Sequence, residues 1–329
     1  MAGIDIFNIE PSKISRDLKG KYILIYGAPK TGKSTFGSKL PRSLFLQFEQ
    51  GTNALDGIRG VPIFKWSDMK SVLRQLRDPR AKNMYDSIVV DTAGIAYNLC
   101  EQFVCQQNGV QQISEIPWGG GFKLVKNEFQ ETWREISLLG FGILFIAHEK
   151  ERATEMRDEN GEQIRAVAPD LPSAAYSIIN GLVDIIGYLS TQMNQDGSTN
   201  RYLYTRATPN IFAGSRYKYI APRISFNQDG YTELVNAIGD AIDKQVNVDG
   251  AQATDKTILP NYTTRPFGET MNEARELWQK IIEVKGDAGK EEMKNAIRRI
   301  FGQDVQLSKA TEDQQDLVEL VIEEFKTIL

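Results

Sequence analysis

Short apolar runs alternate with amphipathic stretches through the first half of the chain. Four of these runs are too short for helices and predict buried strands, at residues 22–26, 42–48, 87–91 and 141–147. Helical patterns lie at residues 67–77, 96–107 and 123–139, and a further helix is expected from Lys33. This alternation predicts an α/β fold in which a mostly parallel sheet is flanked by helices on both faces.

The pattern changes after residue 180. Residues 183–191 and 201–208 flank a turn signal at 194–197, so they predict a hairpin added to the edge of the sheet. A closing helix is expected over residues 231–244. The residues that follow are mostly polar and lack periodicity, which is typical of a linker.

Three further amphipathic patterns lie at the end of the chain, and the third begins with a capping box at Thr311 and Gln314. From Phe267 onward there are fourteen acidic and nine basic residues, a net charge of −5. These observations predict a small acidic helical domain. It is expected to bind a partner protein, to shield the core from DNA, or simply to pack as structure. The predicted organisation is a core at 1–245, a linker at 246–266 and this domain at 267–329.

The composition argues against several classes of protein. The chain has 329 residues and a formal net charge of −4, so binding of nucleic acid would need a local basic patch. Two cysteines and the single histidine, His148, argue against a disulfide framework and a histidine-based metal cluster. No apolar stretch approaches the roughly 20 residues of a membrane span, and residues 1–10 lack the pattern of a signal peptide. A cytoplasmic protein without membrane contact is expected.

The sequence from Gly27 to Ser34 matches the phosphate-binding pattern G-x-x-x-x-G-K-[ST], between a predicted strand and a predicted helix. Its backbone N–H groups are expected to surround phosphate oxygens, while Lys33 reaches the β- and γ-phosphates and Ser34 binds Mg²⁺. The sequence therefore predicts a P-loop ATPase that uses ATP and Mg²⁺. The residues expected to bind the nucleotide are Gly27, Ala28, Pro29, Lys30, Thr31, Gly32, Lys33, Ser34 and Thr35.

Three polar residues end the neighbouring predicted strands, and the carboxyl ends of parallel strands share one edge of a sheet. Asp91 is expected to complete the magnesium site with Ser34, or else to cap the next helix. Glu49 is expected to activate the attacking water, the alternative being an exposed strand-end glutamate. His148 is expected to contact the γ-phosphate and sense its loss, or to be structural.

This order of motifs resembles the RecA-like recombinase core. The closer similarity is to RecA-like ATPases of bacteriophages that act with single-strand annealing systems, with their Gly-x-Pro-Lys-x-Gly-Lys cradle and a last strand that ends in Ala147-His148-Glu149-Lys150. The resemblance covers residues 20–244 and departs from RecA at His148, where RecA usually has glutamine. It implies an ATP-hydrolysing, single-stranded-DNA-binding recombination protein that forms homo-oligomers, in the host cytoplasm if it is phage-encoded.

The resemblance also implies two DNA-lining loops, here residues 106–122 and 149–172. Trp118 and Lys123 are candidate DNA contacts of the first, because an exposed aromatic ring can stack on a base. A second candidate surface, residues 201–223, interleaves tyrosines with cations that include Arg201 and Arg206. The alternatives are mobile, solvated loops and an ordinary edge hairpin.

Arg216 and Lys218 have a third possible role, because a cation from a neighbouring subunit can reach the γ-phosphate in trans in RecA-like assemblies. Two other functions stay open at this point. One is a nucleotide-dependent protein switch or loader without intrinsic DNA affinity. The other is a small-molecule kinase, which usually carries an arginine-rich lid over the phosphates.

Overall fold

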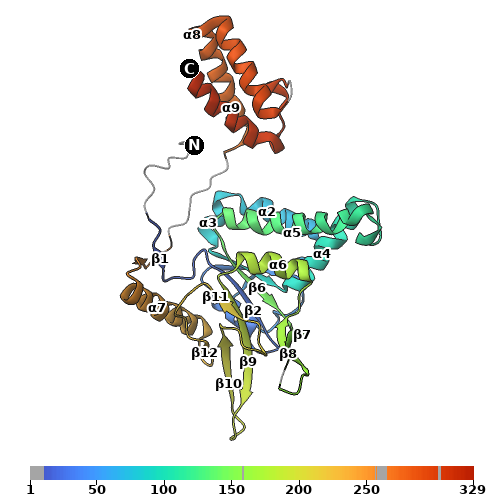
Figure 1. Ribbon diagram of the computed structural model, residues 1–329, viewed down its shortest axis with the longest axis vertical. Helices are drawn as coiled ribbons and strands as arrows, with labels where there is room; N and C mark the ends of the chain where they lie inside the picture. The colour runs from blue at the N-terminus through green and yellow to red at the C-terminus, as the bar shows by residue number, and fades with distance from the viewer. Residues whose placement is uncertain (1–10, 158, 256, 258–264, 303–304) are drawn as a thin grey trace. The chain divides into compact units, whose positions relative to one another are not determined.

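The computed structural model describes residues 11–157, 159–255, 257, 265–302 and 305–329. These residues fall into two compact units, a core within residues 12–262 and a helical unit within residues 263–329. The predicted α/β architecture, a mostly parallel sheet flanked by helices with a C-terminal helical region, is confirmed (Figure 1). None of the helices in the described residues has the length and apolar character needed to cross a membrane.

The main sheet has the strand order β12-β10-β9-β2-β6-β5-β3-β4, with β11 paired to β9. All neighbours from β9 to β4 are parallel, and β10, β11 and β12 pair in antiparallel fashion at the other edge. The bounds are β2 (Tyr22–Tyr26), β3 (Ser43–Gln47), β4 (Arg59–Pro62), β5 (Ser87–Asp91), β6 (Gly142–Ala147), β9 (Ile185–Met193), β10 (Thr199–Tyr204), β11 (Gly214–Ser215) and β12 (Arg223–Ser225).

Helices cover both faces of this sheet because its central strands are apolar on both sides. In β2, Ile23 and Ile25 pack toward one helix layer, and Leu24 and Tyr26 toward the other. The first layer contains α1 (Lys33–Lys39) and α7 (Gly230–Asp249). The second contains α2 (Trp66–Leu76), α4 (Ala93–Gln107), α5 (Gly120–Leu138) and α6 (Ser173–Leu182), and the short helix α3 (Pro79–Met84) follows α2.

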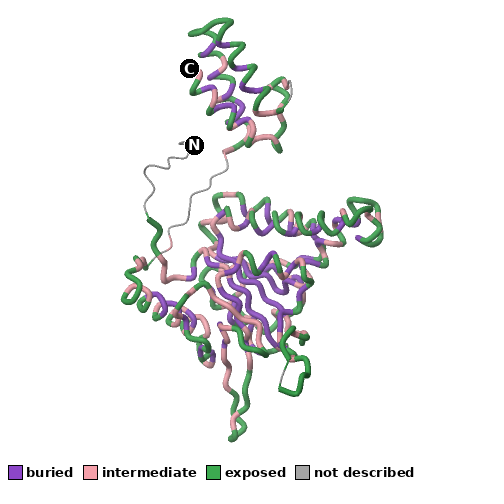
Figure 2. The backbone as a smooth tube through the Cα atoms, viewed as in Figure 1, coloured by how far each residue is buried: buried purple, intermediate pink, exposed green. Residues whose placement is uncertain are grey.

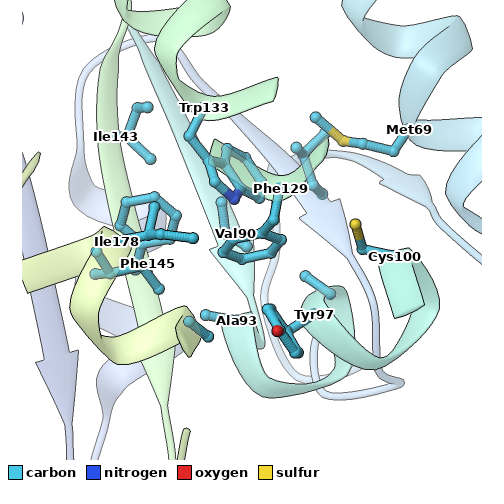
Figure 3. Packing of buried hydrophobic residues seen from close by; sticks show 14 of the residues in the cluster. Met69, Val90, Ala93, Tyr97, Cys100, Phe129, Trp133, Ile143, Phe145 and Ile178 are labelled. Carbon is cyan, nitrogen blue, oxygen red and sulfur yellow. The ribbon is translucent and has the colours of Figure 1, made fainter. Parts of the chain in front are cut away.

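Aromatic side chains fill the larger of the two layers. Trp133 is fully buried and meets Phe129 and Phe145 edge-on, at centroid distances of 5.5 and 5.1 Å (Figure 3). Edge-to-face packing of this kind adds to the free energy gained by burial alone. Figure 2 shows the central strands buried along their length and the tip of the β9–β10 hairpin exposed. Phe145 belongs to β6, so this aromatic layer packs directly against the strand that ends before His148.

Several boundaries differ from the prediction. Helix α5 begins at Gly120 rather than Lys123, so the glycine-rich end of the first predicted loop is helical. Helix α2 begins at Trp66, close to the predicted residue 67, and the Asp68 carboxylate accepts from the backbone N–H of Lys65, the residue before the helix. Helix α6 and strand β4 were not expected. Strand β4 lacks alternating apolar residues, whereas α6 buries Ala175, Ile178 and Ile179 at helical spacing, a signal that was available in the sequence.

The second predicted loop is largely an antiparallel hairpin of β7 (Glu149–Arg157) and β8 (Gln163–Pro169). Alternating half-buried and exposed positions allow this two-stranded sheet, with a register irregularity between Ala153 and Arg157. Residue 158 of this loop lies outside the described residues. An ordered hairpin at this place differs from the mobile, solvated loop that the polar sequence suggested.

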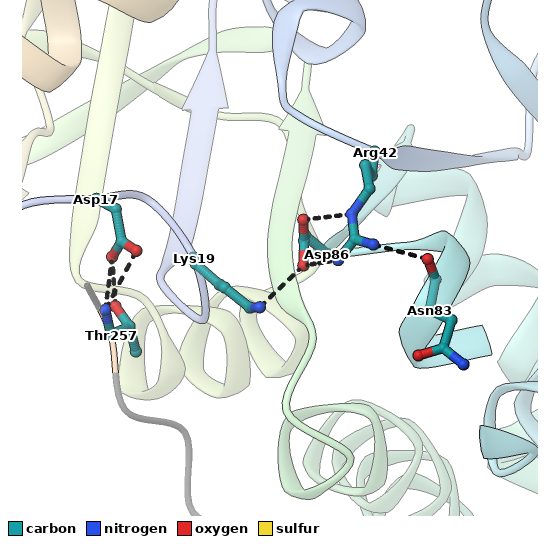
Figure 4. Close-up of polar contacts among 6 residues, drawn as sticks. All are labelled: Asp17, Lys19, Arg42, Asn83, Asp86 and Thr257. Carbon is teal, nitrogen blue, oxygen red and sulfur yellow. Dashed lines mark hydrogen bonds and ion pairs between the residues drawn. The ribbon is translucent and has the colours of Figure 1, made fainter. Parts of the chain in front are cut away.

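The chain stays attached to the core beyond residue 245. Helix α7 continues to Asp249 and ends at Gly250, whose φ of 70° is typical of a helix C-terminus. Strand β13 (Ala253–Thr254) then pairs with β1 (Ile14–Ser15), and the Thr257 N–H donates to the Asp17 carboxylate (Figure 4). The described residues from 246 to 257 thus pack on the core, and residues 258–264 of the predicted linker lie outside the described residues.

A second polar cluster lies at the amino ends of β2, β3 and β5. Arg42, in the turn after α1, donates to both carboxylate oxygens of Asp86 and to the carbonyl of Asn83 (Figure 4). Lys19 approaches the same carboxylate at 3.2 Å. These cations hold the pKa of Asp86 below its usual range, with the Arg42 hydrogen bond as the main cause. Asp86 therefore links α1 and β2 to the start of β5.

The C-terminal unit is built from α8 (Phe267–Phe301) and α9 (Gln315–Ile328). Gly286, with φ 57° and ψ −136°, breaks α8 into two arms, so the three predicted helical patterns correspond to these arms and α9. The capping box at Thr311 is present. The two short 3-10 helices are η3 (Leu307–Lys309) and η4 (Glu312–Gln314). The unit has an apolar core of its own that includes Met271, Ile281, Met293, Val321 and Phe325.

Candidate functional site

The phosphate cradle is the turn between β2 and α1. A Cβ atom on Gly27 would lie 2.3 Å from the carbonyl oxygen of Leu189, so only glycine fits against strand β9. Gly32 has a φ of 101°, in the left-handed region that favours glycine. The Lys33 Nζ donates to the carbonyls of Gly27 and Ala28 at 2.8 and 2.7 Å. The loop backbone therefore curves around the side chain of Lys33.

Lys33 is a buried cation, with 6% of its surface exposed. Burial lowers its pKa, an effect opposed by the nearby carboxylates of Asp91, Glu149 and Glu49. Its hydrogen bonds in the described part of the chain go to carbonyl groups rather than to a carboxylate. A desolvated ammonium group at a helix N-terminus favours an anionic ligand, so the cradle fits a nucleotide phosphate.

Ser34 and Asp91 meet as predicted, with the Ser34 Oγ donating to Asp91 Oδ2 at 2.7 Å. Asp91 ends β5, and 1% of its surface is exposed. Burial raises its pKa, the Ser34 hydrogen bond lowers it, and the neighbouring Glu49 raises it. A hydroxyl and a carboxylate oxygen are the ligands that Mg²⁺ prefers, so these two residues fit a magnesium ion bound together with phosphates.

Glu49 and His148 lie side by side at the ends of β3 and β6. The Glu49 N–H donates to the Asp91 carbonyl at 3.2 Å, which fixes Glu49 beside the magnesium-site residue. His148 Nε2 lies 3.5 Å from the Glu49 carboxylate. The Thr92 hydroxyl donates to the same Glu49 carboxylate, also at 3.5 Å. Since His148 and Thr92 are both potential donors, they can orient this carboxylate.

Thr92 and Glu149 belong to this neighbourhood but were not predicted as site residues. Thr92 follows Asp91 through a cis peptide bond and is buried. Glu149 has a buried carboxylate oxygen, and its charge acts on Lys33 and on Tyr188. Its place directly after β6 was the available signal, because strand-end residues collect at this edge.

The predicted cations of residues 201–223 make contacts within the chain. The Arg201 guanidinium lies against the cradle, with Nη1 2.7 Å from where a Cβ on Gly32 would be. Arg206 donates to the carbonyls of three residues: Ser215, Tyr217 and Lys218. Arg216 pairs with Asp184 at 3.0 Å, and Lys218 pairs with Asp249 at 3.0 Å. A role in trans or on DNA would require these contacts to be exchanged, and both roles stay predictions.

Trp118 and Lys123, the candidate DNA contacts of the first predicted loop, are both exposed. Trp118 lies in the turn that joins α4 to α5, with a φ of 60°, and its ring is fully exposed. Phe122, one turn further on, is also exposed. Large apolar side chains in solvent often mark a binding surface.

Asp91→Asn is expected to raise the melting temperature of the nucleotide-free protein and to abolish its stabilisation by magnesium with ATP. Because the folded-state pKa of Asp91 lies above 3.8, the wild type loses stability as the pH rises from 3.8 through that folded-state pKa. The asparagine side chain does not ionise, so the variant does not lose stability in this way. Thermal unfolding across pH measures the effect. Asp86→Asn is the matched control, and it should lower the melting temperature because the pKa of Asp86 is depressed. A lower melting temperature for Asp91→Asn would contradict the assignment.

Residues 19–217 match the family described as the AAA domain. The SPbeta prophage-derived uncharacterized protein YorG of Bacillus subtilis (strain 168) is 29% identical, with 99% of each chain covered. Among solved structures, the flagellar accessory protein FlaH of Methanocaldococcus jannaschii is similar with a TM-score of 0.35 and 14% identity, over 64% of this chain and 88% of that one. The KaiC-like protein PH0186 of Pyrococcus horikoshii OT3 is similar with a TM-score of 0.37 and 12% identity, over 63% of this chain and 85% of that one. Because the family match spans more than half of the chain and contains the cradle with its strand-end acids, this protein belongs to the AAA domain family.

Proposed function

We propose that this protein is an ATP-hydrolysing, single-stranded-DNA-binding recombination protein of phage type, active as a homo-oligomer. The observation that carries the ATPase part is the Ser34–Asp91 contact beside the buried Lys33, with Glu49 held at the adjacent strand end. The prophage origin of the relative from Bacillus subtilis supports the phage assignment. The host cytoplasm is the corresponding location.

Each residue of the site has a role in this proposal. MgATP supplies the phosphoanhydride bond and a metal ion that neutralises phosphate charge. Lys33 gives up its carbonyl partners to bind phosphate oxygens, and Ser34 and Asp91 hold the metal ion. Glu49 accepts the proton of the attacking water. His148 orients Glu49 and transmits the loss of phosphate to the β7 hairpin that follows it.

The DNA-binding part of the proposal rests on Trp118. A fully exposed indole beside the exposed Phe122 and Lys123 offers two rings for base stacking and a cation for the backbone. The start of α5 packs closely on the buried Ile113, whose carbonyl oxygen would lie 2.4 Å from a Cβ atom on Gly121, and this contact supports the turn that carries the rings.

Trp118→Ala is expected to weaken binding of a single-stranded oligonucleotide about 5- to 150-fold, since one base–aromatic stack contributes about 1–3 kcal/mol. Fluorescence anisotropy of labelled oligo-dT in the presence of a non-hydrolysable ATP analogue measures this affinity. Phe64→Ala, which removes an exposed ring outside the predicted DNA loops, is the control and should bind as the wild type does. Equal affinities for all three proteins would remove Trp118 from the DNA surface.

A protein switch or loader without DNA affinity is the second candidate. It is favoured by the intramolecular contacts of Arg206 and Arg216, which leave a smaller basic surface than the sequence suggests. The same titration decides between the two, because a loader would show no saturable oligonucleotide binding by the wild type.

A further inference from the structure

The C-terminal unit contains a groove of about 860 Å³, the size of a site for a small ligand or a short peptide. It lies between the two arms of α8 and residues 305–308, which follow the second arm. Its floor is apolar and consists of Met271, Ala274, Trp278, Ile297 and Leu307.

The floor is held by the core of the unit. Met271, Ala274 and Ile297 are buried, so their side chains are part of the helix packing and close the groove from below. The ring of Trp278 lies 5.9 Å from that of Phe325 and also lines the groove. The groove is therefore a preformed apolar surface.

The rim carries the opposite charge to the rest of the unit. The cations Arg275 and Lys294 line the groove, and the lining residues in the described part of the chain include one carboxylate, Glu291. From Phe267 onward the chain has a net charge of −5, so this surplus of positive charge is local. Glu291 pairs with Lys294 at 3.0 Å, both largely exposed, and such a pair contributes little and is easily exchanged.

We infer that this groove binds an acidic amphipathic peptide segment of a partner protein. Apolar side chains of the peptide occupy the floor, and its carboxylates pair with the rim cations Arg275 and Lys294. The Arg275 guanidinium donates to the Asn272 side-chain oxygen at 3.5 Å, a long hydrogen bond between neutral and charged groups that a carboxylate can replace. Single-stranded DNA suits the groove less well, because a long polyanion would continue onto the acidic surface around it. A short peptide confines its charge to the rim. This inference does not depend on ATP hydrolysis by the core.

The test uses the full chain and labelled 12-residue synthetic peptides. One has leucine and phenylalanine at helical spacing with aspartate and glutamate elsewhere, and its counterpart has lysine at every acidic position. Fluorescence anisotropy is expected to show saturable binding of the acidic peptide, at least tenfold tighter than the basic one. Arg275→Ala with Lys294→Ala should weaken it at least tenfold, and Leu307→Ala should also weaken it. Lys280→Ala, an exposed cation of the same arm outside the groove, is the matched control.

Melting temperature and ATP binding of each variant show that the fold and the core site are intact. The inference is overturned if the wild type shows no saturable binding or binds both peptides equally. It is also overturned if the double variant binds like the wild type, or if oligo-dT occupies the groove in place of the peptide. Self-association that the double variant abolishes, measured by sedimentation, would instead assign the groove to a second copy of this chain.

Discussion

Replacing Lys33 with alanine is expected to reduce ATP hydrolysis by about 10²–10³-fold and to weaken nucleotide binding, the range found when a positioned charge-stabilising donor is lost. Lys33 is buried, and burial lowers its pKa, so the folded protein holds a desolvated cation that a phosphate group would neutralise. Alanine removes the two hydrogen bonds from Lys33 Nζ to the loop carbonyls but leaves Gly27 and Gly32, whose backbone conformation and close packing shape the loop. The loss should therefore be one of chemistry rather than of folding.

Steady-state phosphate release and titration with a fluorescent ATP analogue measure the two effects of Lys33→Ala. Lys39→Ala is the matched control, since it removes an exposed lysine from the last turn of the same helix, α1. It should leave both quantities unchanged. Undiminished hydrolysis by a folded Lys33→Ala protein would place the nucleotide site elsewhere.

Glu49→Gln is expected to lower hydrolysis by about 10²–10⁴-fold while ATP affinity is preserved, as for the loss of a general base. The carboxylate sits 3.5 Å from His148 and close to Asp91, so it borders the predicted magnesium site without belonging to it. Glutamine keeps the size and the hydrogen-bonding oxygen of the side chain but does not accept the proton from water.

Glu149 provides the control for this assignment, because it is a second carboxylate near Lys33. Single-turnover hydrolysis by Glu49→Gln and Glu149→Gln separates the two acids, with binding measured in parallel. A severe loss only in Glu149→Gln would transfer the role of the base to that residue. His148→Ala is expected to fall between the wild type and Glu49→Gln, since it orients the base.

The parallel half of the fold was predictable because its strands are apolar on both faces and its helices have clear periodicity. Strand β4, with Gly60 and Pro62, lies at an edge and lacks that signal. The β7–β8 hairpin was missed because its outward residues are charged, so its sequence resembles that of a loop. Helix α7 extends five residues beyond the predicted end at Lys244. The residues after Lys244 lack a regular apolar pattern, and the helix ends only at Gly250.

The meeting of Ser34 with Asp91 was predictable, because a strand-end position fixes which edge of a parallel sheet a residue occupies. Contacts made by long side chains were not. Arg201 and Arg206 were candidate DNA contacts because cations and tyrosines are interleaved there, and a DNA role stays a prediction. In the structure their guanidinium groups approach the cradle and a set of backbone carbonyls, contacts that the sequence did not indicate. The direction of a flexible arginine is decided by partners that are remote in sequence.

We propose that ATP hydrolysis at Lys33, Asp91 and Glu49 is coupled to single-stranded DNA. The most direct test is steady-state ATP hydrolysis by the full chain with and without a single-stranded oligonucleotide, with Lys33→Ala as the blank. We expect the wild type to hydrolyse ATP faster when DNA is present, and the variant to show no hydrolysis. Hydrolysis that is indifferent to DNA, in a protein that retains no DNA, would contradict the recombination function and leave a nucleotide-dependent protein switch.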